Sequence, residues 1–532
     1  MKWLRPKWPF RSCLKQQILS KQTHYQIPGR MKKLLTLFFG FAIAMGYAQK
    51  APLLNYAKQI KAFDTYVEHA RQEWKVPGLA VALVKDGRIL FTKGYGVREL
   101  GQPEPVDTET LFTCASTTKA MTAVCMGMLV DEGKVKWDDP VVQYLPEFQL
   151  YDAYATRDLK IRDLFLHNSG VGNADFLWSG MNISSDEVIR KMRLVQPSYS
   201  LRGGFVYQNI FYLAAGQVIE KVSGQTWSDF VRQRIFKPLG MNRTRATRGE
   251  AANDPNQVKP HYLVKGVIQV IENTSADQIG PAGSVWSSIG DISKWVLCML
   301  DSSKYEGGRL LQPATFREMF KPQTLVTSEQ FYPTQTLTKP NWMTYGLGWF
   351  QHDYKGKKVN FHTGSLAGAI AIHGQIPEEQ IGIYVFGNFD HAEVRHALMY
   401  KAFDLFALGG DRDWSADLLK LYSGIREKGE RAQKDFEAKR NVNTRPSLAL
   451  ESYAGKYTDP LYGEVTITLS GDKLEFNINN FVKATLGHWH FDTFYGPYEK
   501  AWYGNAIARF TLTATGKVEN LEFDGLTFKR NQ

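Results

Sequence analysis

The first apolar positions of the chain recur with helical spacing and then with the spacing of strands. In residues 55–74 they fall every three or four positions, at Tyr56, Ile60, Phe63, Tyr66 and Val67. This spacing predicts a helix that ends before Pro77. The apolar runs 79–84 and 89–95 that follow are strand-like, and Asp86-Gly87 between them favours a tight hairpin.

Helical spacing dominates from about residue 115 to 300, with Gly and Asn between the segments. Strand-like runs then return at 346–352, 359–362, 369–376 and 381–387. Residues 391–408 predict a closing helix. Strands at both ends with helices between them predict an α/β sandwich in which the terminal segments pair in one sheet, as a domain over residues 51–410.

The remainder of the chain changes character. Residues 411–446 form a charged, helix-like linker, and residues 447–532 hold short alternating runs such as 464–469 and 508–512 between Gly and Asp turns. Evenly spaced short strands predict a separate antiparallel β-barrel. Two domains also suit a chain of 532 residues, because one hydrophobic core rarely organises so many.

The net charge of +12 is concentrated at the N-terminus. Residues 1–48 hold nine of the 65 Lys and Arg residues and no acid, so the rest carries 56 basic and 53 acidic residues. Lys32-Lys33, an apolar run and a small-residue site predict a signal peptide over 31–48, cleaved after Ala48. Residues 1–30 are interpreted as a non-native upstream extension. The run is too short for a stable membrane anchor, which takes about 20 residues.

We therefore expect a periplasmic or secreted protein. The part that remains after cleavage is nearly neutral, so no nucleic-acid partner is expected. Cleavage after Ala48 removes Cys13 and leaves Cys114, Cys125 and Cys298. Three cysteines cannot all be paired in disulfides, so we interpret them as buried core residues. No His or Cys cluster has convincing zinc spacing, so we expect no metal and no cofactor.

Chemistry is first suggested by Ser116-Thr117-Thr118-Lys119 at the start of a helical run. A spacing of three places the hydroxyl and the amine on one helix face, where a lysine of lowered pKa can deprotonate a serine. The helix N-terminus also favours the negative charge of a tetrahedral intermediate. The motif is weak by itself, because it also occurs at Ser12 with Lys15 and at Ser470 with Lys473.

Two downstream motifs strengthen the hypothesis. Tyr207-Gln208-Asn209 and His362-Thr363-Gly364 follow Ser116 in order, with separations of 91 and 155 residues. With them, residues 55–405 resemble the serine β-lactamase, penicillin-binding protein and D-peptidase superfamily, in particular its class C-like branch, which includes many esterases. Residues 448–530, with Tyr453-Ala454-Gly455-Lys456-Tyr457, resemble the lipocalin-like domain of CubicO-group serine peptidases.

The resemblance implies a β-lactamase/transpeptidase-like sandwich, an antiparallel sheet flanked by helices with a helical lobe, followed by a small lipocalin-like barrel. It implies Ser116 as the acylated nucleophile and Lys119 as part of its activation. Tyr207 is then either a base in its phenolate form or a relay that passes the proton to the leaving group.

The resemblance also implies a set of residues that bind the substrate. Asn209 holds the carbonyl or amide of the substrate. His362, Thr363 and Gly364 lie on the neighbouring strand, where His362 faces the tyrosine. The backbone N–H groups of Ser116 and Ser365 form the oxyanion hole.

One difference from the pattern of this superfamily decides the order of the candidate reactions. Many β-lactamases and carboxypeptidases of this clan carry Lys at the position of His362, and a neutral His grips a substrate carboxylate less firmly. The leading hypothesis is therefore an exported hydrolase that cleaves an ester or amide bond in a small-molecule or peptide substrate, with D-residue peptides among the candidates. The alternatives are a class C-like β-lactamase and a penicillin-recognising sensor without turnover. The oligomeric state and any role of the barrel at the site stay open.

Overall fold

The computed structural model describes residues 55–531. The predicted signal peptide, the upstream extension and Cys13 lie outside the described residues. Within the described range, no helix combines the length and apolar character that crossing a bilayer requires. The sheet domain and the barrel belong to one compact unit, Asn55–Gln532.

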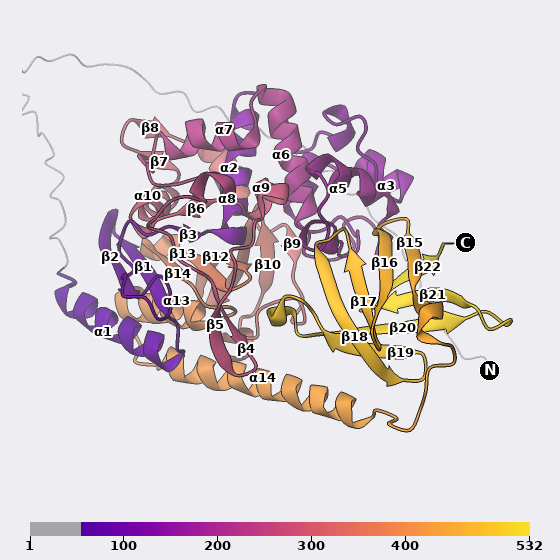
Figure 1. Ribbon diagram of the computed structural model, residues 1–532. Coiled ribbons are helices and arrows are strands. Elements are labelled where there is room, and N and C mark those ends of the chain that lie inside the picture. Colours follow the sequence, from indigo (N-terminus) through magenta and orange to yellow (C-terminus); the bar gives the residue numbers. More distant parts are fainter. Residues whose placement is uncertain (1–54, 532) are drawn as a thin grey trace, which may run out of the picture. The chain divides into compact units, whose positions relative to one another are not determined.

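The centre of the first domain is an antiparallel sheet in which strands from the two ends of the domain lie side by side (Figure 1). In spatial order it contains β2 (Arg88–Gly96), β1 (Gly78–Lys85), β14 (Ile381–Gly387), β13 (Ala369–Ile376), β12 (Lys357–Leu366), β11 (Trp349–Tyr354), β10 (Met343–Gly346) and β9 (Thr324–Leu325). β1 pairs with β14 from Leu79↔Gly387 to Lys85↔Ile381. The predicted pairing of the terminal segments is therefore confirmed.

The sheet is covered on both faces, and β1 shows how its sequence separates two cores. Ala80, Ala82 and Val84 belong to the core of the helical lobe, whereas Leu79 and Val81 belong to the opposite core. Successive side chains of a strand point to opposite faces, so an entirely apolar strand is the pattern of a sheet buried on both sides.

One face of the sheet packs against α1 (Ala57–Glu73) and α13 (Val394–Phe403), and the helical lobe covers the other. The helices between β2 and β10 are α2 (Thr118–Asp131), α3 (Ala153–Asp158), α4 (Phe176–Ser179), α5 (Ser185–Lys191), α6 (Ile210–Ser223), α7 (Trp227–Val231), α8 (Arg248–Ala251), α9 (Gly280–Gly283), α10 (Ile289–Leu300), α11 (Pro313–Met319) and α12 (Gln335–Thr338). Between them lie the short strands β3 (Phe112–Thr113), β4 (His261–Val264), β5 (Val267–Val270), β6 (Trp286–Ser287), β7 (Lys304–Tyr305) and β8 (Gly308–Arg309).

The structure confirms the turn predicted at residues 86–87 but not the strand predicted over residues 346–352. The Asp86-Gly87 turn is confirmed, with φ of 50° and 71°, the left-handed geometry that a two-residue hairpin uses. The single strand expected over 346–352 is wrong, because the chain turns at Gly348, with φ 85°, between β10 and β11. A Cβ at Gly348 would lie 3.1 Å from the carbonyl oxygen of Lys119, so this apolar corner packs directly against α2.

The predicted C-terminal barrel is confirmed as a closed antiparallel barrel in which β15 also pairs with β22. Its strands are β15 (Gly455–Asp459), β16 (Gly463–Ser470), β17 (Lys473–Ile478), β18 (Val482–His490), β19 (Thr493–Pro497), β20 (Asn505–Leu512), β21 (Val518–Phe523) and β22 (Leu526–Arg530). The long helix α14 (Trp414–Ala438) connects it to the first domain (Figure 1). The Phe176 and Tyr462 rings pack edge to face, 5.5 Å apart, where barrel and helical lobe meet.

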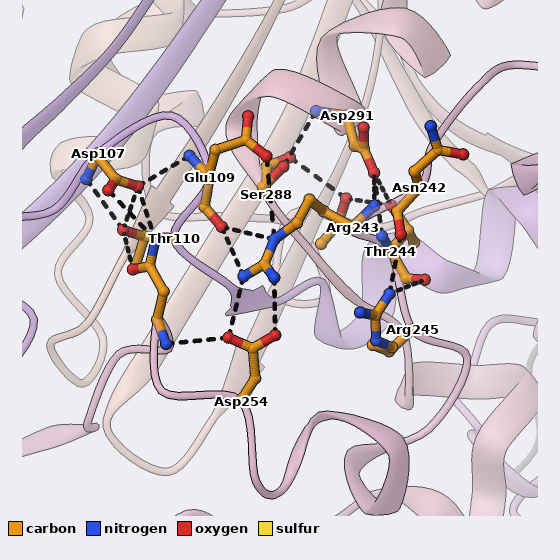
Figure 2. Close-up of polar contacts among 12 residues, drawn as sticks. Asp107, Glu109, Thr110, Asn242, Arg243, Thr244, Arg245, Asp254, Ser288 and Asp291 are labelled. Carbon is orange, nitrogen blue, oxygen red and sulfur yellow. Dashed lines mark hydrogen bonds and ion pairs between the residues drawn. The ribbon is translucent and has the colours of Figure 1, made fainter.

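The segment leading to Ser116 is held by a network of polar contacts. β3, which precedes it, pairs with β6. Just beyond β6, Asp291 accepts hydrogen bonds from the backbone N–H groups of Arg243 and Thr244, and Arg243 forms an ion pair with Asp254 at 2.8 Å (Figure 2). A buried carboxylate with several donors is well satisfied, so this network fixes the loop beside β6.

The three cysteines among the described residues are free and buried, as predicted. Burial raises the pKa of the Cys114 and Cys298 thiols to about 12. These thiols stay protonated at neutral pH and act as small core side chains.

Candidate active site

Ser116 lines a cavity and directly follows a strained residue, Ala115. It is the middle residue of the 3-10 helix Ala115–Thr117, which leads directly into α2. Ala115 has φ 44°, a left-handed conformation that residues with a side chain rarely adopt. Such strain is characteristic of functional sites. The cavity, of about 490 Å³, is lined by Ser116, Asp175, Trp178, Phe205, Tyr207, Asn209, Gln330, Phe331, Tyr332, Pro333, Phe350, Thr363, Ser365, His391, Glu393 and Arg395.

Lys119 lies one turn below Ser116 and is fully buried. Its Nζ atom is 3.0 Å from Ser116 Oγ, 2.7 Å from Asn209 Oδ1 and 3.0 Å from the carbonyl oxygen of Ala282. Burial lowers the pKa of Lys119 from 10.5 to about 7, although the negative charge of Asp175 opposes the shift. A substantial fraction of this amine is therefore neutral at neutral pH.

The contacts of Lys119 suit the neutral form. A neutral amine has two N–H donors and one lone pair, whereas an ammonium has three donors. Asn209 Oδ1 and the Ala282 carbonyl are acceptors, so they take the two N–H groups. The lone pair is then left for the hydroxyl proton of Ser116.

Tyr207 completes the group that the sequence predicted would converge. Its side chain lines the same cavity as Ser116, and Lys119 Nζ lies 5.0 Å from the centre of its ring. Burial raises the pKa of the phenol well above 10, and the neighbouring Ser116 side chain only partly offsets this. The ring is held by His167, whose ring centre is 4.3 Å away. Tyr207 is therefore a neutral phenol near pH 7.

Asn209 links Lys119 to a carboxylate that the sequence did not indicate. Its Nδ2 donates to Asp175 Oδ2 at 2.9 Å, and its Oδ1 accepts from Lys119. The other oxygen of Asp175 accepts from Trp178 Nε1 at 2.8 Å. The Asn209 side chain is thus oriented from both ends and has one defined amide geometry.

The end of β12 passes very close to the loop that carries Ser116. A Cβ added at Gly364 would lie 2.2 Å from the Cys114 carbonyl oxygen, so only glycine allows this approach. Thr363 and Ser365, on either side, both line the cavity, and Thr363 Oγ1 is 2.5 Å from the Tyr332 hydroxyl. The structure thus brings both predicted oxyanion-hole residues to the same cavity.

His362 lies behind this wall of the cavity. Its Nδ1 is 2.6 Å from the Thr363 carbonyl oxygen, and its Nε2 is 2.9 Å from the hydroxyl of Tyr345, not that of Tyr207. The His362 and Tyr207 rings pack with centres 6.2 Å apart. Burial lowers the pKa of His362 to about 3, so the ring is neutral and its contact with Tyr207 is one of packing.

Arg395 is a further buried side chain at the site, and no motif pointed to it. It donates to the Gly364 carbonyl at 2.6 Å and to Ser365 Oγ at 2.9 Å, and it pairs with Glu393 at 2.8 Å. In a trans peptide the C=O and N–H point in opposite directions. Arg395 therefore fixes the Gly364–Ser365 peptide with the Ser365 N–H directed away from itself.

This contact predicts a positioning role for Arg395. We expect Arg395→Lys to lower kcat by about 10²-fold with little change in KM, because small errors in active-site geometry cost rates of this order. Steady-state kinetics, with circular dichroism as a check on folding, measure the effect. Removing Arg395 alone would leave the buried Glu393 carboxylate without its ion-pair partner, which destabilises the fold. The second variant therefore replaces both residues, as Glu393→Gln/Arg395→Met. If it folds and keeps the wild-type kcat, the role is wrong.

Across residues 55–531, no three His, Cys, Asp or Glu side chains are grouped so that they could hold a metal ion. Ser116 and Tyr207 bring a hydroxyl and a phenol to the cavity, and the Lys119 amine lies beside the Ser116 hydroxyl.

Comparison with known proteins adds family and fold. The family profile described as "Beta-lactamase" matches residues 63–405, and one described as a domain of unknown function (DUF3471) matches residues 439–532. The chain is 27% identical over 423 residues to "Unguisins hydrolase ungD'" of Aspergillus campestris, across 76% of this chain and 77% of the relative. It is 23% identical over 339 residues to "Protein flp" of Staphylococcus aureus, across 62% of each chain.

Among solved structures, the chain is similar to the octameric penicillin-binding protein homologue from Pyrococcus abyssi. The TM-score is 0.58 at 23% identity, and the match covers 88% of this chain and 99% of the other. The crystal structure of SurE with D-Leu matches with a TM-score of 0.51 at 17% identity, over 89% of this chain and 100% of that one. At these identities the likeness concerns the fold.

Proposed function

Because this chain belongs to the beta-lactamase family, we propose that it is a serine hydrolase that cleaves an ester or amide bond through an acyl intermediate on Ser116. Relatives named as hydrolases support hydrolysis as the class of reaction. The observation that carries the proposal is the Lys119 amine, 3.0 Å from Ser116 Oγ, with a pKa of about 7.

In the proposed first step, neutral Lys119 takes the hydroxyl proton while Ser116 Oγ attacks the substrate carbonyl. The new C–O bond leaves a negative charge on the carbonyl oxygen, which accepts hydrogen bonds from the N–H groups of Ser116 and Ser365. Pre-oriented donors of this kind stabilise the transition state more than the substrate. The role of Arg395 in orienting Ser365 supports this assignment.

In the second step, the neutral phenol of Tyr207 gives its proton to the leaving alcohol or amine. Lys119, which holds the proton from the first step, then restores the phenol. A water molecule hydrolyses the acyl-enzyme by the same route in reverse, so the net reaction is substrate plus water giving acid plus alcohol or amine. The high pKa of Tyr207 favours this relay over the alternative of a phenolate base.

The charges around the cavity favour esters and amides over β-lactams. A β-lactam carries a carboxylate that needs a fixed cation, and neutral His362 does not supply one. Arg395 also lines this cavity, but its guanidinium already binds Glu393 and two main-chain carbonyl groups. We therefore rank β-lactam hydrolysis second, and a sensor that is acylated without turnover third.

We also propose that the protein is exported to the periplasm or secreted, without a stable membrane anchor. The proposal rests on Lys32-Lys33 and the short apolar run after them, which lie outside the described residues. The near-neutral charge of the remaining chain argues against a nucleic-acid partner, and from the proposed hydrolysis we propose a small-molecule or peptide substrate as the partner.

A substrate comparison tests the proposed function. Purified protein of residues 49–532 would be assayed with short-chain p-nitrophenyl esters, D-aminoacyl amides and a chromogenic cephalosporin. We expect turnover of an ester or amide. Rapid turnover of the cephalosporin alone would reverse the ranking, and stable acylation by intact mass spectrometry without turnover would favour the sensor.

The relay through Tyr207 makes its own prediction. Tyr207→Phe removes the proton that the leaving group receives, while the ring and its packing remain. We expect kcat to fall by about 10²- to 10⁴-fold for an alkyl ester or amide. In the acylation step alone, the loss should be much smaller for a p-nitrophenyl ester, because p-nitrophenolate departs without protonation. Equal losses in the acylation rates of both substrates, measured by stopped flow, would argue against the relay.

A further inference from the structure

A second and larger cavity adjoins the catalytic one. Its volume is about 810 Å³, within the range of pockets that bind drug-sized ligands. Three side chains line both cavities: Trp178, Ser365 and His391. Since Ser365 is a proposed oxyanion-hole residue, a group in the second cavity lies next to the carbonyl that Ser116 attacks.

One wall of the second cavity comes from the barrel. Phe481, Lys500, Trp502 and Tyr503 lie in turns of the barrel and line the cavity. Lys500 forms an ion pair with Glu272 of the first domain at 2.5 Å, and its Nζ lies 5.1 Å from the Phe481 ring centre and 5.8 Å from the Trp502 ring centre. This aromatic wall is therefore tied to the first domain.

The opposite wall is joined to the catalytic residues. Trp178 donates to Asp175 through its indole N–H, and Asp175 accepts from Asn209, which contacts Lys119. This chain of hydrogen bonds is part of the catalytic geometry. A ligand against Trp178 therefore touches the same framework that orients Asn209.

The position of Tyr207 indicates which part of the substrate enters the second cavity. Tyr207 lines the catalytic cavity and is not among the residues that line the second one. The leaving group must lie beside the phenol that protonates it. The acyl group, on the other side of the scissile bond, is then directed past Ser365 toward Trp178 and the barrel.

The carboxylates in this cavity have partners. Glu272 forms an ion pair with Lys500, and Asp390 lies 2.5 Å from His391 and raises its pKa above 6.5. Because its carboxylates have partners and its walls carry several aromatic side chains, the cavity suits apolar and aromatic groups and not a highly charged ligand.

We propose that the second cavity binds the acyl part of a peptide or peptide-like substrate with bulky apolar or aromatic side chains, and that the barrel supplies one wall of this subsite. The inference rests on the proposed function, because it takes the direction of the substrate from the role of Tyr207. It gives the barrel a part in substrate selection.

Three p-nitrophenyl esters test the subsite: the ester of acetic acid, and the esters of N-acetyl-Phe-Phe in the L and in the D series. Wild type should prefer one of the peptidyl esters in kcat/KM. We expect Trp502→Ala to lower kcat/KM for that ester by at least about ten-fold, because buried aromatic side chains dominate binding energy. The acetate, which leaves the second cavity empty, should change by less than about two-fold.

Matched variants separate the possible outcomes. Tyr503→Ala, at a side chain that is 38% exposed, should act in the same direction with less risk to folding. Phe491→Ala removes an exposed aromatic of the barrel outside both cavities and should keep the wild-type preference. Failure of a fluorophosphonate to label Ser116 would overturn the proposed function. Labelling with no peptidyl preference, or with a preference that Trp502→Ala leaves intact, would overturn the subsite alone.

Discussion

Replacing Ser116 with alanine is expected to lower kcat for every substrate by at least about 10⁴-fold and to leave the fold intact. The Oγ atom is the nucleophile in the proposed reaction, and neither Lys119 nor Tyr207 can replace it. The Ser116 hydroxyl hydrogen-bonds with Lys119 but does not cap α2, so the helix does not depend on it. Burst-phase kinetics with a p-nitrophenyl ester, and intact mass after fluorophosphonate treatment, measure the effect.

The chain provides a matched control for this experiment. Ser470 and Lys473 repeat the Ser-x-x-Lys spacing, but they lie at the turn between β16 and β17, and Ser470 is exposed. Ser470→Ala should retain wild-type rates and labelling. If Ser116→Ala remained labelled by the fluorophosphonate, the nucleophile would be another residue and the mechanism proposed above would fail.

The two Ser-x-x-Lys motifs differ in their surroundings and not in their spacing. Both place a serine three residues before a lysine, yet Lys119 is fully buried, which lowers its pKa, whereas Lys473 is exposed. Burial depends on the Ala282 and Asn209 contacts, which come from distant parts of the chain. The downstream Tyr207 and His362 motifs therefore carried the prediction, because they indicated that such contacts would form.

The outline of the fold could be predicted from the sequence because the spacing of apolar residues indicates which side chains are buried. The apolar strand at 79–84 and the alternating runs after 447 each have one arrangement that satisfies their pattern. Gly348 shows the limit. An apolar run continues through its turn because that turn packs against α2, and only the tertiary contact makes an apolar corner favourable.

The supporting residues of the site were less accessible. Asp175 and Arg395 are single charged residues outside any motif, and charged residues of this kind are usually solvated. Their importance comes from where they lie, Asp175 against Asn209 and Arg395 against the Gly364 carbonyl. The sequence placed His362 beside Tyr207 but did not indicate its hydrogen bond to Tyr345. That bond forms because β10 and β12 both flank β11 in the sheet.

The pH dependence of the reaction should follow Lys119. The neutral amine is the base, and its fraction increases as the pH rises through about 7. Activity should therefore rise with pH, and kcat/KM at pH 6 should be roughly one tenth of its plateau value. Tyr207, with a pKa well above 10, and His362, with a pKa of about 3, keep constant protonation across this range. His391 also lines the cavity, and its hydrogen bond with Asp390 raises its pKa above 6.5.

Variants at Lys119 and His391 show which of the two residues causes the rise in activity around pH 7. His391→Asn should leave the midpoint near pH 7, whereas Lys119→Met should remove it and lower kcat by about 10²- to 10⁴-fold. Lys119→Arg is the more stringent test, because arginine can still donate to Asn209 and Ala282 but cannot lose its proton at these pH values. Stopped-flow acylation between pH 5 and 9 gives the profiles. If Lys119→Arg retained both the rate and its rise with pH, Lys119 would serve only to donate hydrogen bonds to Asn209 and Ala282. The base would then be another residue of the cavity.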